Sequence, residues 1–229
     1  MDQIVVIGGG GHAKMVIEAA RSGNQARVVC CLDVRPSVPE LLGVPVVEET
    51  PEQIRAYCRE GVHFFVGIGE NRLRQRVMQR IADLGGYFAT IVAESAYVSP
   101  SAILGEGTVV MPKAVVGAMA RVGSGVILNT ACSVDHDTRI DDYAHIAPGC
   151  HLAGKVDVGE GALLGIGTCV IPGIRIGAWA TLGANSTVIR EIPDHSTSVG
   201  SPARCIRVDK VPTMPSERSP IDKKPRQGR

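Results

Sequence analysis

An aliphatic residue returns at every sixth position over a long stretch of this chain. From Val98 to Val188, sixteen consecutive positions spaced by six are all Val, Leu or Ile. The fourth residue after each of them, from Ala102 to Ile192, is Ala, Ser, Thr, Cys, Val or Ile. A period of six fits neither the turn of an α-helix nor the alternation of a plain strand. It predicts a short strand followed by a turn, with one large and one small side chain pointing inward in each unit.

Three such units would close a triangular coil of 18 residues, and successive coils would stack at about the 4.8 Å spacing of paired strands. A narrow interior agrees with the composition, in which aromatic residues make up only 3%. The pattern resembles the hexapeptide-repeat acyltransferases and covers residues 98–192 without an insertion. That resemblance implies a left-handed parallel β-helix. A β-solenoid without catalytic activity is the alternative.

The N-terminal part follows a different pattern, with strands expected at 3–7, 27–32, 63–68 and 87–92 and helices at 13–21 and 72–84. A strand, a glycine-rich loop, a helix and a strand ending in an acidic residue form the βαβ order of a nucleotide site. We therefore expect an α/β, Rossmann-like βαβ domain over residues 1–95, followed by the β-helix and its C-terminal cap over 96–208. Residues 209–229 are rich in Pro, Lys, Arg and Ser and are expected to be disordered.

The first loop reads Gly8-Gly9-Gly10-Gly11-His12-Ala13-Lys14. Its Gly-x-Gly-x-x-Ala spacing loosely fits a dinucleotide fingerprint, so NAD binding is one alternative. The string more closely resembles one acyltransferase subfamily, the N-acetyltransferases for UDP-bacillosamine and GDP-perosamine precursors and their sialic-acid O-acetyltransferase relatives. In that subfamily the small domain binds the nucleotide sugar. The resemblance implies that Gly10, Gly11 and His12 hold the diphosphate or sugar, that Asp33 contacts the base or ribose, and that Gly69 lines the same pocket.

The Asp-His-Asp string at 135–137 lies within the repeat, and the register turns His136 outward. An amine that attacks a thioester must lose a proton, and histidine is the side chain that accepts one near neutral pH. An adjacent carboxylate such as Asp137 can fix the tautomer of the imidazole.

The subfamily resemblance assigns roles to these and to neighbouring residues. It implies that His136 is the catalytic base, that Asp137 supports it, and that Asn129 faces the acceptor. It also implies acetyl-CoA contacts at His145, Gly154, Ile166 and Ala184. One departure is that relatives have His-Pro before the first coil, where this chain has Ala93-Glu94.

Two other kinds of chemistry are disfavoured. His136, His145 and His151 lie within one coil length, as in β-helical zinc enzymes, but the Asp-His-Asp string is not the zinc pattern, and no metal is expected. A covalent acyl-cysteine is also not expected, because Cys132 and Cys150 occupy inward positions of the repeat and buried thiols are poor nucleophiles. Direct transfer in a ternary complex is the preferred mechanism.

Composition narrows the partners and the location. A net charge of +1 gives no indication of nucleic-acid binding, and no apolar run is long enough to insert in a membrane. The first residues lack the basic segment of a signal peptide. Seven cysteines without CxxC spacing suggest reduced thiols in the cytoplasm.

The sequence therefore predicts an acetyl-CoA-dependent N-acetyltransferase that acts on a 4-amino-4,6-dideoxy sugar linked to UDP, GDP or dTDP, for surface-glycan or glycoprotein biosynthesis. The resemblance also implies a homotrimer. A sialic-acid-type O-acetyltransferase and a non-catalytic nucleotide-sugar-binding β-helix are the alternatives. The sequence leaves the nucleotide and the sugar open.

Overall fold

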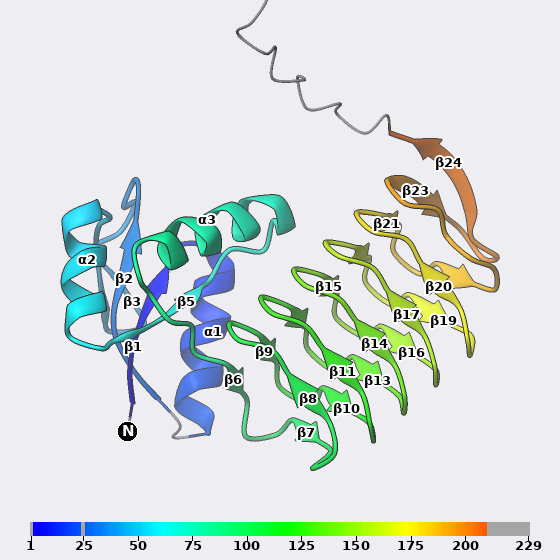
Figure 1. The fold of residues 1–229 in the computed structure, drawn as a ribbon, viewed down its shortest axis with the longest axis horizontal. Helices are drawn as coiled ribbons and strands as arrows, with labels where there is room; N and C mark the ends of the chain where they lie inside the picture. The colour runs from blue at the N-terminus through cyan, green and yellow to red at the C-terminus, as the bar shows by residue number, and fades with distance from the viewer. Residues whose placement is uncertain (1, 24–25, 210–229) are drawn as a thin grey trace, which may run out of the picture.

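The computed structural model describes residues 2–23 and 26–209, so the tail expected to be disordered lies almost entirely outside the described residues. The chain begins with an α/β unit and continues as a long stack of coils (Figure 1). The elements of the first unit are β1 (Asp2–Ile7), α1 (Gly11–Ser22), β2 (Ala26–Asp33), β3 (Glu40–Leu41), β4 (Val44–Glu48), α2 (Pro51–Arg59), β5 (His63–Val66) and α3 (Asn71–Asp83).

The first unit is a small parallel sheet covered on both faces. Its strand order is β3-β4-β2-β1-β5, in which β3 alone pairs antiparallel. Side chains alternate along β1, so that Ile4 and Val6 pack against α1 while Val5 and Ile7 pack against α2 and α3. The carboxyl ends of β1, β2, β4 and β5 meet at one edge, where open α/β sheets bind their ligands. The predicted Rossmann-like architecture is thus confirmed.

Two details of this unit differ from the sequence prediction. β4 and α2 were not predicted, although Thr50 and Gln53 form a complete capping box at the start of α2. The strand predicted at 87–92 is wrong: Phe88 forms a single bridge to Phe64, and Ile91–Val92 is β6, which pairs with the coil strand β9 (Val109–Val110). Val92 continues the six-residue period one step before Val98, and this is why the segment joins the coil rather than the first sheet.

The remaining strands form a left-handed parallel β-helix with three sheets, as the repeat and the family resemblance together predict. The first sheet has eight strands: β6 (Ile91–Val92), β9 (Val109–Val110), β12 (Ile127–Leu128), β15 (His145–Ile146), β18 (Leu163–Leu164), β21 (Thr181–Leu182), β23 (Ser196–Val199) and β24 (Arg204–Val208). The second has six: β7 (Tyr97–Val98), β10 (Val115–Val116), β13 (Ser133–Val134), β16 (His151–Leu152), β19 (Cys169–Val170) and β22 (Thr187–Val188). The third has five: β8 (Ile103–Leu104), β11 (Arg121–Val122), β14 (Arg139–Ile140), β17 (Asp157–Val158) and β20 (Arg175–Ile176).

From β6 to β19, each strand pairs with the strand 18 residues later, as in Val115 with Ser133. The aliphatic residue of each unit and the small residue four positions on fill the interior, and all of them are buried except Val98, Ala102, Leu104 and Ile174. Cys132 and Cys150 are buried as the register predicted, with exposed fractions of 1% and 0%. Burial raises the pKa of the Cys132 thiol to about 12. Neither thiol is therefore a ready nucleophile.

Three corners join the sheets, and each is named here by a residue or helix that marks it. The His136 corner joins the six- and five-stranded sheets through residues 117–120, 135–138, 153–156 and 171–174. The α3 corner joins the five- and eight-stranded sheets through 123–126, 141–144, 159–162 and 177–180. The Asn129 corner joins the eight- and six-stranded sheets through 129–132, 147–150, 165–168 and 183–186.

The first unit packs on the beginning of the eight-stranded sheet and along the α3 corner. Ile91, Val109 and Ile127 belong to the same apolar cluster as the α1 side. Figure 1 shows α1 beside β6 and α3 above the first coils. The His136 corner is opposite the eight-stranded sheet in the triangular coil, and therefore on the side away from the first unit.

At the far end of the coil, β23 pairs with β21, and β24 runs antiparallel to β23. None of the described helices has the length and apolar character required to cross a membrane. All seven cysteines lie in the described part of the chain and are free.

Candidate functional site

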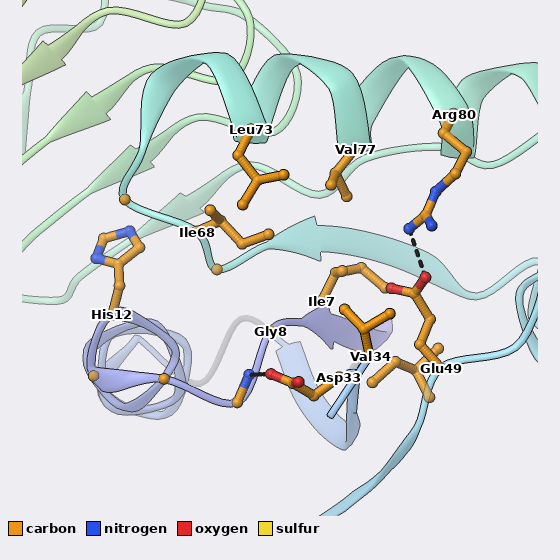
Figure 2. Close-up of a pocket in the computed structure, with 16 residues that line it drawn as sticks. Ile7, Gly8, His12, Asp33, Val34, Glu49, Ile68, Leu73, Val77 and Arg80 are labelled. Atoms are coloured by element: carbon orange, nitrogen blue, oxygen red, sulfur yellow. Dashed lines mark hydrogen bonds and ion pairs between the residues drawn. The ribbon is translucent and has the colours of Figure 1, made fainter. Parts of the chain in front are cut away.

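A cavity of about 460 Å³ opens at the carboxyl edge of the first sheet. Gly8 to His12 form one side of it, and Ile68, Leu73 and Val77 form the other (Figure 2). It contains Gly10, Gly11, His12, Asp33 and Gly69, the substrate-binding residues predicted in the first unit. Asn129 lies instead on the coil, beside His145.

The start of α1 gives this cavity its electrostatic character. Gly10 is the N-cap of α1 and supplies no side chain to bond the first backbone N–H groups. Those groups and the helix dipole favour an anion such as a diphosphate. By contrast, the carboxylate of Glu70 accepts hydrogen bonds from the backbone amides of Arg72 and Leu73 and so caps α3. Of the two helix starts near the cavity, the start of α1 is the one left open to a ligand.

Asp33 holds the glycine loop in shape. Its Oδ2 accepts a hydrogen bond of 2.6 Å from the backbone N–H of Gly9, and its Oδ1 accepts one of 2.8 Å from that of Arg35. A Cβ at Gly9 would lie 3.0 Å from Asp33 Oδ2, so a side chain there would crowd this contact. Asp33 therefore orients the loop, in addition to any contact it makes with a ligand.

His12 lies at the end of the cavity that is nearest the coil. Its Nε2 is buried and has no hydrogen-bond partner among the described residues. Burial, with a smaller contribution from the charge of Arg74, lowers the pKa of His12 to about 4. The ring is therefore neutral at physiological pH, with a polar atom available to a ligand.

His145 lies on the other side of Gly69. It lines a second cavity of about 410 Å³ together with Gly69, Glu70 and Trp179. Its Nε2 is 3.0 Å from the Nδ2 of Asn129, while Asn129 Oδ1 accepts from the amide of Thr130. Burial first, and then Arg74 and His12, lower the pKa of His145 to about 4. The structure thus brings together His12, Gly69, His145 and Asn129 at the junction of the two units.

Arg74 fixes this junction, and sequence analysis missed it. The side chain projects from α3, and the residue is 1% exposed. Its guanidinium donates to the carbonyls of Ile68 and Gly69 in the first unit and to those of Gly125 and Tyr143 on the coil, at 2.7–3.1 Å. Burial lowers its pKa to about 10, so it remains charged at neutral pH. In the sequence it is one of several arginines on a polar helix, and no local signal distinguishes it.

His136 and Asp137 form a separate group at the His136 corner. The Nδ1 of His136 is 2.8 Å from the Oδ2 of Asp137, and the two side chains are 55% and 50% exposed. A carboxylate at Nδ1 favours the tautomer that carries its proton there, which leaves Nε2 able to accept a proton, as a general base requires.

Gly154 lies one coil beyond His136, on the same corner. A Cβ on Gly154 would lie 2.6 Å from both Cε1 and Nε2 of the His136 ring. Because Gly154 has no side chain, the His136 ring can lie directly against it. The family resemblance implies a coenzyme contact at Gly154, and the geometry adds this second role.

The other predicted coenzyme residues lie elsewhere on the coil. Ile166 and Ala184 are exposed on the Asn129 corner, stacked one coil apart, with the amide of Asn185 donating to the carbonyl of Ile166. His136 lies on a corner, His145 lies on the eight-stranded sheet and His151 lies on the six-stranded sheet. Among the residues that the structure describes, no three His, Cys, Asp or Glu side chains are placed to hold a metal ion.

Comparison with known proteins finds a family model for the first unit and several related acetyltransferases. Residues 3–81 match the family model of the PglD N-terminal domain. The chain is 39% identical over 113 residues to UDP-N-acetylbacillosamine N-acetyltransferase from Bacillus subtilis, covering 48% of this chain and 52% of that enzyme. It spans only 25–38% of the length of the first curated relatives that it matches, which are serine acetyltransferases.

The solved structures that match nearly the whole chain include two with a bound coenzyme. The acetyltransferase domain of PglB from Neisseria gonorrhoeae, in complex with acetyl coenzyme A, is 38% identical with a TM-score of 0.85, and the match covers 89% of this chain and 98% of that one. A histidine-to-asparagine variant of perosamine N-acetyltransferase from Caulobacter crescentus, in complex with CoA and GDP-perosamine, is 41% identical with a TM-score of 0.84, and the match covers 90% and 97%.

Proposed function

Since this chain belongs to the family of nucleotide-aminosugar N-acetyltransferases, we propose that it transfers the acetyl group of acetyl-CoA to a nucleotide-linked 4-amino-4,6-dideoxy sugar. The observation that carries this proposal is the His136–Asp137 pair, an exposed imidazole whose Nδ1 is held by a carboxylate 2.8 Å away. The glycine-lined cavity with the uncapped start of α1 supports the nucleotide-sugar part. The N-acetylated nucleotide sugar would then be used in surface-glycan or glycoprotein synthesis.

In this proposal the two units divide the work. Residues 1–95 hold the nucleotide sugar, with the diphosphate over Gly10 and Gly11 and the sugar near His12 and Gly69. Residues 96–208 supply the base and hold acetyl-CoA. Ile166, Ala184, Gly154 and His145 are the proposed coenzyme contacts, and Asn129 is proposed to face the acceptor.

The proposed chemistry is a direct transfer. The sugar amine attacks the thioester carbonyl, and the Nε2 of His136 takes a proton from the amine as the new C–N bond forms. The C–S bond then breaks, and the imidazolium returns the proton to the departing CoA sulfur. Asp137 keeps the Nδ1 proton in place throughout, so that Nε2 is the nitrogen free to act. No metal enters these steps.

The assembly proposed is a homotrimer in the cytoplasm. His136 lies on the corner opposite the sheet that carries the first unit, whereas Ile166 and Ala184 lie on another corner. One chain cannot gather these residues, but the His136 corner of one protomer could meet the nucleotide cavity and Asn129 corner of its neighbour. Light scattering should give three times the chain mass, and a fully active monomer would refute this arrangement.

The test of the activity is a panel of nucleotide 4-amino sugars with acetyl-CoA, followed by release of free thiol. We expect release with at least one amino sugar and an N-acetyl product by mass spectrometry. An O-acetyl product from a sugar that lacks the amine would favour the sialic-acid-type reaction. Tight sugar-nucleotide binding without thiol release from any of them would indicate a binding protein.

A further inference from the structure

An ion pair between a buried carboxylate and a half-exposed arginine lies at the end of the nucleotide cavity farthest from His12. Glu49 follows β4, and its Oε1 is 2.6 Å from the Nη2 of Arg80 on α3. Its backbone amide donates to the carbonyl of Asp33, which anchors it at the end of the sheet. Figure 2 shows Glu49 and Arg80 at one end of the cavity and His12 at the other. Sequence analysis assigned a role to neither residue.

The burial of the Glu49 carboxylate at the cavity wall indicates that it binds a ligand. The Glu49 side chain is 4% exposed, whereas the Arg80 side chain is 48% exposed. The contact with Arg80 is made at Oε1 of Glu49. A carboxylate so little exposed to solvent is costly unless its oxygens are paired with donors. Because Glu49 lines the cavity, a bound molecule can supply such a donor.

The cavity determines which part of a nucleotide sugar reaches this pair. The acceptor sugar must lie toward the coil, where His12 and Gly69 lead to the junction. The uncapped start of α1 receives the diphosphate in the middle. The nucleobase then lies at the opposite end, with the apolar Val34 and Val77 beside it and Glu49 and Arg80 against its edge.

Taken from Arg80 toward Glu49, the pair can supply a donor and then two acceptor oxygens. The Watson–Crick edge of guanine presents the complementary order of the O6 acceptor, the N1–H donor and the N2–H donor. We propose that Glu49 and Arg80 recognise guanine, which makes the substrate a GDP-linked amino sugar. This inference rests on the proposed function, because it takes the cavity to be the nucleotide site.

Other bases do not fit this order. Uracil and thymine present an acceptor, one N–H donor and a second acceptor, so that a carbonyl oxygen would face Oε2. Adenine places an amino group where Arg80 donates and a ring nitrogen where Oε1 accepts. In a buried site such mismatches leave polar groups unpaired, which discriminates more strongly than a missing contact does.

The experiment measures the binding of GDP, UDP and dTDP to the whole protein by calorimetry, without acetyl-CoA. We expect wild-type protein to bind GDP at least about 10-fold more tightly than UDP or dTDP. Glu49→Gln replaces one acceptor by a donor, so it should weaken GDP binding by roughly 10–100-fold and leave UDP binding unchanged or tighter. Glu52→Gln, on α2 outside the cavity with a side chain 79% exposed, is the matched control and should keep the wild-type preference.

The outcomes separate this inference from the function on which it rests. UDP or dTDP binding by wild-type protein as tight as GDP binding would overturn guanine recognition and leave the nucleotide site intact. An equal loss for all three nucleotides in folded Glu49→Gln would show that the pair only braces α3 against β4. Binding of none of the three to wild-type protein would refute the nucleotide site itself. The wild-type ranking needs no variant, so it tests the inference even if Glu49→Gln fails to fold.

Discussion

The His136 corner and the junction beneath the first unit both contain histidines, in opposite environments. His136 is half exposed, and a carboxylate lies 2.8 Å from its Nδ1. His12 and His145 are largely covered, with a buried arginine nearby and pKa values lowered to about 4. The same side chain is therefore available for proton transfer at the corner and is held neutral at the junction. Among these histidines, the neighbouring charges and the degree of burial therefore decide which one can act as the base.

The largest effect expected at the corner is on catalysis. His136→Ala should lower kcat by about 10²–10⁴-fold, the usual contribution of a general base, with little change in Tm because the side chain is exposed. His63→Ala, in the first sheet away from both regions, is the matched control and should keep wild-type kcat. Thiol release and thermal melting measure the two quantities. A fully active His136→Ala protein would remove the corner from the mechanism.

At the junction, the largest effect expected is on stability. Arg74→Met would leave the carbonyls of Gly125, Tyr143, Ile68 and Gly69 without this donor, and should lower the free energy of unfolding by about 3 kcal/mol. Arg76→Met, on the exposed side of the same helix, should change it by less than about 0.5 kcal/mol. Denaturant unfolding at one fixed protein concentration compares the two. Equal midpoints would show that the arginine does not hold the units together.

An intermediate effect on kcat is expected from a substitution that displaces the His136 ring without unfolding the corner. Gly154→Ala places a methyl group 2.6 Å from Cε1 and Nε2 of His136. The exposed ring can turn away at little cost, so Tm should hold while kcat falls by about 10–100-fold. The KM for acetyl-CoA separates this role from the coenzyme contact inferred from resemblance. A large rise in KM with kcat unchanged would assign Gly154 to the coenzyme instead.

The two units also differ in how far their sequences predict their structure. In the coil each residue meets neighbours 18 positions away, so one period gives the sheets, the interior and the outward turn of His136. Cys132 and Cys150 were placed correctly from this register alone. The exception is Ile91–Val92, where a short apolar run fits a first-unit strand and the repeat equally well.

In the first unit the important contacts join residues that no period relates. Arg74 and Gly125 are 51 positions apart, and Glu49 and Arg80 meet across two different elements. Local sequence shows α3 only as a polar amphipathic helix, and burial of an arginine depends on carbonyls that the coil supplies. The glycine loop could be recognised because its chemistry is local. The junction and the Glu49–Arg80 pair could not, because tertiary packing creates them.

The smallest effect expected is the pH dependence of stability at the junction. In the unfolded chain His12 and His145 titrate near the ordinary value of 6.5, whereas in the folded protein they stay neutral until about pH 4. Between these values the unfolded state binds more protons, so the free energy of unfolding falls as pH drops from 7 to 5. Allowing for partial solvent screening, the two histidines together should account for about 1–2 kcal/mol of that fall.

Other groups also titrate in this range, so the test is a difference between proteins. His12→Asn and His145→Asn should each flatten the curve of unfolding free energy against pH relative to wild type, and the double variant should flatten it most. The comparison uses the change between pH 7 and pH 5 within each protein, because each substitution also alters contacts at neutral pH, such as that between His145 and Asn129. A double variant with the wild-type change would mean that the junction histidines are protonated as readily in the folded protein as in the unfolded chain. The contrast with the His136 corner would then rest on exposure alone.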